Sequence, residues 1–187
     1  MAYIDETLVF ESDKVYYTDD LGTEFQVMMT WEDSIMKASA DYVCEGGGDI
    51  LEIGFGMGIS AGYIQANSIS SHTIVENHPQ MIVKAKAWAV GKPNVTIVEG
   101  DWYDVKDSLS TYSGIFYDTW ADDNTNNFVN ELHNLVKSGT RVTWWNNFTD
   151  IDDVFFIDGT TYQAINVKPD SNIYFNSNIY YLPKKQF

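Results

Sequence analysis

The sequence predicts a doubly wound α/β fold, in which a mostly parallel sheet carries helices on both of its faces. Short apolar runs alternate along the chain with stretches of helical length and spacing, the order typical of βαβ units. A glycine-rich turn, residues 54–58, separates the first of these runs from the helix that follows it. The 187 residues, 44% of them hydrophobic, suffice for one domain with its own core. We therefore expect residues 1–187 to form a single domain.

Each expected element has its own pattern of apolar and turn residues. Residues 24–44 are predicted to form a helix, since Met28, Ile35, Met36 and Val43 follow helical spacing. The parallel strands are predicted at residues 49–54, 72–76, 95–98, 114–118 and 140–145. The helices between them are predicted at residues 58–66, 79–90 and 125–137.

The sequence predicts the structure of the C-terminal part of the chain but not that of its first 20 residues. Gly139 follows the last predicted helix, where a C-cap belongs. Beyond it, β-rich runs at residues 162–167 and 179–182 predict a C-terminal antiparallel hairpin on one edge of the sheet, which then has seven strands. Residues 1–20 are strand-prone or loose, and their pattern assigns them no role.

Composition restricts the class of partner. The formal net charge of -16 disfavours nucleic acid, because such a field repels phosphate, and it favours a cation, although acidity also serves solubility. No apolar run approaches the roughly 20 residues of a membrane span. The first residues are acidic, unlike a signal peptide, and Cys44 is the only cysteine. We expect a cytoplasmic protein, a monomer or homodimer, with no membrane partner.

The glycine turn and two acids indicate a nucleotide-type ligand. Gly54, Gly56 and Gly58 let the backbone approach a ligand, but a dinucleotide fingerprint would need a third glycine at Ile59. Glu76 ends the second strand 22 residues after Gly54, where a carboxylate can accept hydrogen bonds from ribose hydroxyls. Asp101 and Trp102 follow the third strand, at the place where an adenine would lie. The spacing with these acids favours S-adenosylmethionine, with S-adenosylhomocysteine as product, over NAD.

Two further carboxylates suggest a cationic second ligand. Asp118 ends the fourth strand at the edge where open α/β sheets bind ligands, although a turn or cap acid is the alternative. Glu32 lies four residues from both Met28 and Met36 and so shares an apolar helical stripe, unless it reaches solvent from the edge of that stripe. If both face the crevice, a guanidinium fits them better than an ammonium, because its planar fork matches carboxylates.

These residues resemble a known family. The sequence is similar to guanidinoacetate N-methyltransferase and related guanidino methyltransferases, which have a Rossmann-like class I methyltransferase fold. The elements that carry the resemblance include Trp31-Glu32, Gly54-Phe55-Gly56-Met57 and Tyr117-Asp118-Thr119. The matching stretches occur in the family's order and cover roughly residues 25–146; they are residues 27–36, 50–57, 75–77, 100–102 and 117–119.

The resemblance implies an activity and a set of site residues. The activity is N-methylation of a small cationic guanidino compound, guanidinoacetate-like or arginine-like, with Glu32 orienting the group and Asp118 accepting its proton. Acceptor contacts are implied for Glu32, Met36, Asp118 and Thr119. Cofactor contacts are expected from Met28, Glu52, Gly54, Phe55, Gly56, Met57, Gly58, Glu76, Asn77, Asp101 and Trp102.

The sequence departs from the family in the regions that read the far end of the acceptor. The family follows its fifth strand with Asn-Leu-Thr, whereas here Asn146 is followed by Asn147 and Phe148, and the next segment is shorter. Three alternatives therefore stay open: a methyltransferase of this fold for another small amine, a cofactor-binding module without turnover, and a dehydrogenase. His72, His78 and His133 show no metal-ligand spacing, so no metal is expected.

Overall fold

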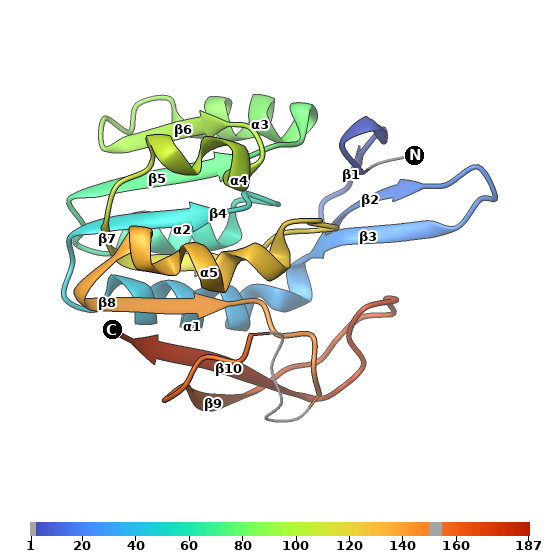
Figure 1. The fold of residues 1–187 in the computed structure, drawn as a ribbon. Helices are drawn as coiled ribbons and strands as arrows, with labels where there is room; N and C mark the ends of the chain where they lie inside the picture. Colours follow the sequence, from blue (N-terminus) through green and yellow to red (C-terminus); the bar gives the residue numbers. More distant parts are fainter. Residues whose placement is uncertain (1–2, 150–154) are drawn as a thin grey trace.

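The computed structural model describes residues 3–149 and 155–187, and its largest element is a seven-stranded sheet. The strand order is β6-β5-β4-β7-β8-β10-β9 (Figure 1). The parallel strands are β4 (Asp49–Ile53), β5 (Ser71–Glu76), β6 (Val95–Glu99), β7 (Tyr112–Tyr117) and β8 (Val136–Trp144). The antiparallel edge is formed by β9 (Thr161–Asn166) and β10 (Ile179–Gln186), as the sequence predicted.

Helices cover both faces of this sheet because alternate residues of each strand point in opposite directions. Leu51 and Ile53 pack with Phe128 and Leu132 on the face covered by α4 (Trp102–Val105) and α5 (Thr125–Leu135). Ile50 packs on the other face, which is covered by α1 (Asp33–Cys44), α2 (Ile59–Ala66) and α3 (Pro79–Ala89). The predicted doubly wound α/β fold is confirmed.

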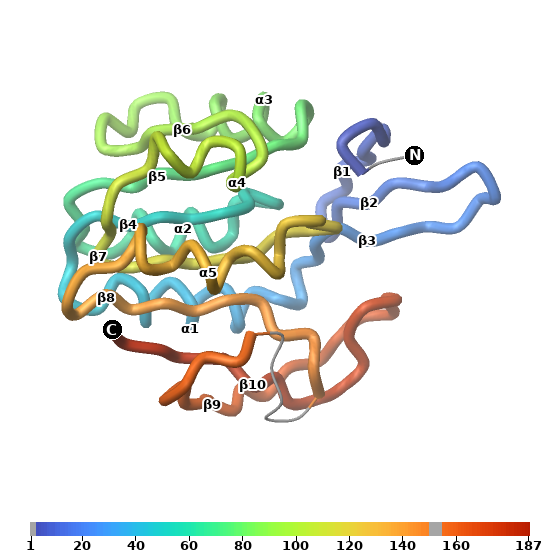
Figure 2. Tube along the Cα trace, viewed as in Figure 1, coloured from blue at the N-terminus to red at the C-terminus, as the bar shows by residue number. Residues whose placement is uncertain are grey.

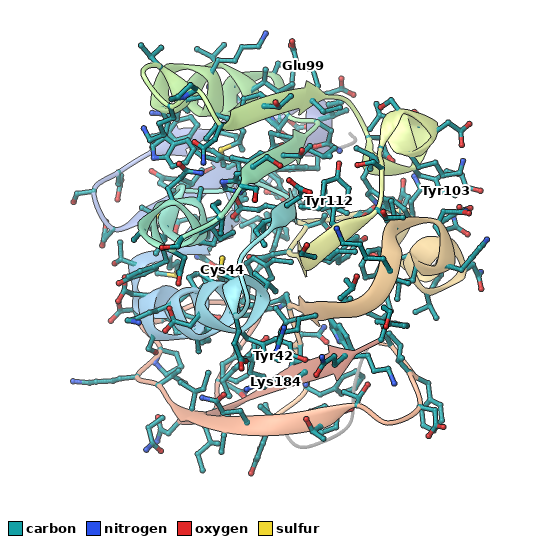
Figure 3. The ribbon with its side chains drawn as sticks, turned by 90° about the vertical axis from the view of Figure 1, so that its left-hand side faces the viewer. Tyr42, Cys44, Glu99, Tyr103, Tyr112 and Lys184 are labelled. Carbon is teal, nitrogen blue, oxygen red and sulfur yellow. The ribbon has the colours of Figure 1, made fainter. Side chains whose placement is uncertain are left out.

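Helix α1 also reaches the added antiparallel edge of the sheet. The ammonium of Lys184 in β10 lies 4.5 Å from the centre of the Tyr42 ring, and Figure 3 shows the two side chains next to each other. Cys44, at the end of the same helix, is buried, and burial raises the pKa of its thiol to about 12. The helix therefore joins the parallel part of the sheet to the C-terminal hairpin.

The predicted helix over residues 24–44 is wrong in its first third. Glu24–Met29 is a strand, β3, which pairs antiparallel with β2 (Lys14–Thr18), and β2 pairs with β1 (Val9–Phe10). A short 3₁₀ turn, Thr30–Glu32, links β3 to α1. The four-residue spacing of Met28, Glu32 and Met36 therefore runs across a strand, a turn and a helix. Spacing along the chain could not reveal the hairpin partner that holds residues 24–29 extended.

The position of Gly139 was also predicted wrongly. Helix α5 ends at Leu135 and β8 begins at Val136, so Gly139 lies inside the strand, with a φ of 91°. Figure 2 shows the β2–β3 hairpin and the β9–β10 connection both extending from the carboxyl end of the parallel strands. Within the described ranges, no helix has the length and apolar character needed to cross a membrane.

Candidate active site

A cleft lies at the carboxyl ends of β4, β5 and β7 and has an empty volume of about 830 Å³, including space open to solvent. One half is lined by the glycine turn after β4 and by the end of β5. The other half is lined by the turn after β7 and by residues from the β3–α1 junction and the β9–β10 connection.

The glycine turn presents bare backbone to the cleft. Gly54 has a φ of 94°, and a Cβ atom there would collide with the carbonyl oxygen of Asp118. Gly56 has a φ of 53°, and a Cβ atom there would collide with the sulfur of Met28. Met28 also accepts a hydrogen bond of 3.1 Å from the backbone N–H of Met57. Only glycine allows this approach of β3 and β7 to the turn.

Glu76 holds the end of β5 against the glycine turn. Its Oε2 accepts the N–H of Phe55 at 2.9 Å, and its Oε1 accepts the N–H groups of Asn77 at 2.9 Å and His78 at 2.8 Å. Burial raises the pKa of this carboxyl, while the three backbone donors oppose the shift. A carboxylate has about four lone-pair sites, so Glu76 keeps acceptor capacity for ligand hydroxyls.

The residues expected to contact the cofactor divide into two groups. The cleft is lined by Met28, Gly54, Phe55, Gly56, Glu76, Asn77 and Trp102. Behind it, Glu52 is fully buried, accepts a hydrogen bond from the Ser60 hydroxyl and lies 2.9 Å from Nε2 of His72. Met57 and Gly58 continue the turn into α2, and Asp101 caps α4 by accepting the Tyr103 N–H at 2.8 Å. These four residues support the cleft wall.

Asp118 and Glu32 form an acidic pair in the second half. The Asp118 side chain follows β7 and accepts no hydrogen bond from residues 3–149 or 155–187. Burial, followed by repulsion from Glu52, raises the pKa of Asp118 to about 7. Burial, followed by repulsion from Asp118, raises the pKa of Glu32 to about 8. Both carboxyls therefore hold a proton more tightly than an exposed acid does, as acids in functional sites often do.

Glu32 is fixed from one side. Its Oε1 accepts hydrogen bonds of 2.7 Å from the Met29 N–H and from the Tyr174 hydroxyl. Tyr174 belongs to the β9–β10 connection, 142 residues along the chain, and no feature of the sequence indicated it. Residue spacing along the chain could not predict the contact between Tyr174 and Glu32. The contact depends on the order of the strands in the sheet, which brings the C-terminal hairpin beside α1.

Aromatic rings enclose the acidic pair. The ring centres of Trp120 and Trp145 lie 5.9 Å and 6.0 Å from that of Tyr174, and all three residues line the cleft. Trp144, the last residue of β8, is fully buried, whereas the next residue, Trp145, lines the cleft.

Thr119 and Met36, which were also expected to contact the methyl acceptor, lie in different environments. Thr119 lines the cleft, and its hydroxyl donates to Asp122 at 3.3 Å. Met36 is fully buried in the core under α1 and is absent from the cleft lining. No group of three or more His, Cys, Asp or Glu side chains in the described part of the chain is arranged to hold a metal ion.

The fold has counterparts among solved structures. A precorrin-6y C5,15-methyltransferase from Geobacter metallireducens superposes with a TM-score of 0.58 at 14% identity, covering 90% of this chain and 92% of that one. A putative S-adenosylmethionine-dependent methyltransferase from Streptococcus mutans gives 0.60 at 12% identity, covering 95% and 57%. The chain therefore has the fold of a class I S-adenosylmethionine-dependent methyltransferase.

The family follows from the sequence match. The model of the family described as guanidinoacetate N-methyltransferase matches residues 17–165, and the chain belongs to this family. A protein arginine N-methyltransferase 2 from Aspergillus oryzae is 39% identical over 127 residues, which cover 64% of this chain. The matched region spans only 30% of that protein's length.

Proposed function

We propose that the chain transfers a methyl group from S-adenosylmethionine to a nitrogen of a guanidino group. The observation that carries this proposal is the acidic pair Glu32 and Asp118, which lies beside the glycine-lined half of the cleft. A guanidinium satisfies both acids at once because its N–H groups lie in one plane and match carboxylates bidentately. The names of the family and of the Aspergillus relative both point to guanidino acceptors.

Residues of the first half fit the methyl donor. Glu76 would accept a hydrogen bond from a ribose hydroxyl, since its three backbone donors leave about one of its four lone-pair sites free. The bare backbone of Gly54 and Gly56 would lie against the ligand, and the Trp102 ring would cover an adenine face. When bound, S-adenosylmethionine supplies an electrophilic methyl group on a sulfonium.

Residues of the second half would prepare the acceptor nitrogen. Glu32, held by Tyr174 and Met29, would fix the guanidinium in the plane needed for in-line attack. A guanidinium nitrogen is a poor nucleophile while it keeps its proton, and its reference pKa is above about 12. As the N–C bond forms, that nitrogen must release a proton. The carboxylate of Asp118 accepts no hydrogen bond from the described residues. We therefore assign Asp118 the role of accepting the proton that the guanidinium nitrogen releases.

The pair Asp118→Asn and Glu32→Gln tests the proposal. Both variants should bind S-adenosylhomocysteine with wild-type affinity in calorimetry, because neither residue belongs to the donor half. Both should lose about 100-fold or more in methyl transfer to guanidino compounds, the scale of a lost general base. Near-normal transfer by Asp118→Asn would remove Asp118 from the role of base. Absence of donor binding by the wild-type chain would refute the whole proposal.

The oligomeric state and the cellular setting are proposed from the composition of the chain. We propose that residues 1–187 act as one methyltransferase domain, as a monomer or homodimer, in the cytoplasm. The support is compositional: the single cysteine is buried and the net charge is -16. Size-exclusion chromatography with light scattering measures the oligomeric state directly.

A further inference from the structure

The charge of the cleft limits what the acceptor can carry. The described residues that line it include four acids, Glu32, Glu76, Asp118 and Asp122, but no Lys, Arg or His. Residues 1–2 and 150–154, which lie outside the described ranges, also contain no basic side chain in the sequence. The side chains of the chain therefore offer no positive charge in this cleft to pair with a carboxylate on the acceptor.

Four neutral donors near the acidic pair already bind an acid of the protein. Asp122 accepts hydrogen bonds from the Trp102 indole N–H at 2.8 Å and from the Tyr117 hydroxyl. It also accepts the Thr119 hydroxyl at 3.3 Å and the Asn124 backbone N–H at 2.7 Å. These four groups satisfy an acid of the protein itself, so they are not available to a second carboxylate.

The backbone after β8 is occupied in the same way. The N–H of Trp145 donates to the Tyr117 carbonyl at 2.9 Å. The N–H of Asn146 donates to the Tyr180 hydroxyl at 2.7 Å, and the N–H of Phe148 to the side chain of Asn146 at 3.2 Å. These three N–H groups cannot also hold an anion without breaking the bonds that they make within the chain.

The enclosing rings favour a cation on an uncharged arm. The faces of Trp120, Trp145 and Tyr174 carry negative charge density, which attracts a cation and repels a carboxylate. The buried indole N–H of Trp120 has no acceptor among the described residues. It is a single neutral donor, and a neutral carbonyl meets it at a smaller desolvation cost than a carboxylate does.

We propose that the acceptor is a guanidinium on an arm without a free carboxylate, and that guanidinoacetate is disfavoured. This inference rests on the proposed guanidino methylation and narrows its substrate class. Two sources supply the chemistry: an arginine side chain within a polypeptide and a small alkylguanidine. Both bring one net positive charge into an acidic cleft, whereas guanidinoacetate brings none.

A matched pair of acceptors tests the role of the carboxylate alone. Guanidinoacetamide has the size and shape of guanidinoacetate but replaces its carboxylate by an amide. We expect kcat/KM for the amide to exceed that for the acid by about tenfold or more, the scale expected for an uncompensated charge at a recognition site. Butylguanidine and N-acetylargininamide, which each carry one positive charge, then distinguish a small alkylguanidine from a peptide arginine, and a preference for either over guanidinoacetate supports the inference.

Two neighbouring acids provide matched variants. Asp122→Asn removes one negative charge from the cleft lining, whereas Asp123→Asn removes one from an exposed position outside it. We expect Asp122→Asn to lower the amide-to-acid ratio and Asp123→Asn to leave it unchanged. The ratio is insensitive to a uniform loss of activity, so partial misfolding of one variant does not obscure it.

The outcomes separate this inference from the proposed function. If guanidinoacetate is methylated as well as or better than guanidinoacetamide, the inference fails and guanidino methylation stands. If the chain binds S-adenosylhomocysteine but methylates no guanidine, the proposed function fails and this inference fails with it. If the amide and either butylguanidine or N-acetylargininamide outperform guanidinoacetate, both stand.

Discussion

Replacing Asp118 by Asn should stabilise the ligand-free protein in a pH-dependent way while it abolishes methyl transfer. The Asp118 carboxyl lies in the cleft without a hydrogen-bond donor or a cation among the described residues, and burial raises its pKa to about 7 from a usual value of 3.8. The folded chain therefore binds a proton at Asp118 more tightly than the unfolded chain does. Under this condition the free energy of unfolding falls as pH rises from about 4 to about 7.

The magnitude follows from the pKa difference. Between about pH 5 and about pH 8, the unfolded chain has Asp118 ionised throughout, whereas the folded chain ionises it only near pH 7. Two pH units at about 1.4 kcal/mol each give a loss of about 2–3 kcal/mol from Asp118 in the wild-type protein. Asparagine does not titrate, so the variant escapes this loss. Removing the Asp118 charge also relieves the repulsion that helps raise the pKa of Glu32.

Urea denaturation measures the effect. The free energy of unfolding is determined for the wild-type chain and for Asp118→Asn at about pH 5 and about pH 8, without donor or acceptor. The advantage of the variant should grow by about 2–3 kcal/mol between the two conditions. Asp123→Asn removes an exposed charge and should show no such growth. A constant difference between wild type and Asp118→Asn would show that the carboxyl is solvated, and the argument for a poised base would fail.

Three further changes test other contacts of the site. Tyr174→Phe removes a hydrogen bond to Glu32, so the pKa of that carboxyl should rise above about 8. We expect kcat/KM for methyl transfer to fall about tenfold, and the low-pH limb of its pH profile to move to higher pH. Unchanged pH profiles would contradict the anchoring role. Glu76→Gln places an amide against three backbone donors, and calorimetry with S-adenosylhomocysteine should show binding weakened about 10- to 100-fold. Gly54→Ala drives a Cβ atom into the backbone beyond β7 and should cost about 3 kcal/mol or more in unfolding experiments. Gly91→Ala, at a similar positive φ but with open space around the Cβ, should lower the free energy of unfolding by less. Equal losses of unfolding free energy in the two variants would show that backbone strain, and not the contact of the Cβ atom, causes the destabilisation.

The sequence predicted the parallel sheet well because each buried strand is a continuous apolar run closed by a polar or glycine turn. The run ending at Gly54 and the run ending at Asp118 lie side by side in the structure, with Asp118 donating its N–H to the carbonyl of Ile53 at 2.9 Å. Placing both at the carboxyl edge of one sheet required only the rule that βαβ units are parallel.

The remaining site depended on pairings that a single sequence does not reveal. Glu32 was selected from a helical stripe, but it lies in a 3₁₀ turn, and it accepts a hydrogen bond from Tyr174, 142 residues along the chain. Met36 belonged to the same stripe and lies in the core. Tyr174 reaches the cleft because it lies in the connection between β9 and β10, and β10 inserts between β8 and β9. Long-range strand order decides these contacts, and local spacing carries no information about it.

The hydrogen bond between Tyr174 and Glu32 shows that the two halves of the cleft are built from parts of the fold that tolerate sequence change to different degrees. The donor half is built from the glycine turn and the strand ends, where the close approach of β7 tolerates no Cβ atom at Gly54. The acceptor half is closed by a connection between two edge strands, which can be lengthened or replaced without moving that turn. A change in this connection can therefore reshape the second half of the cleft while the glycine turn keeps its structure.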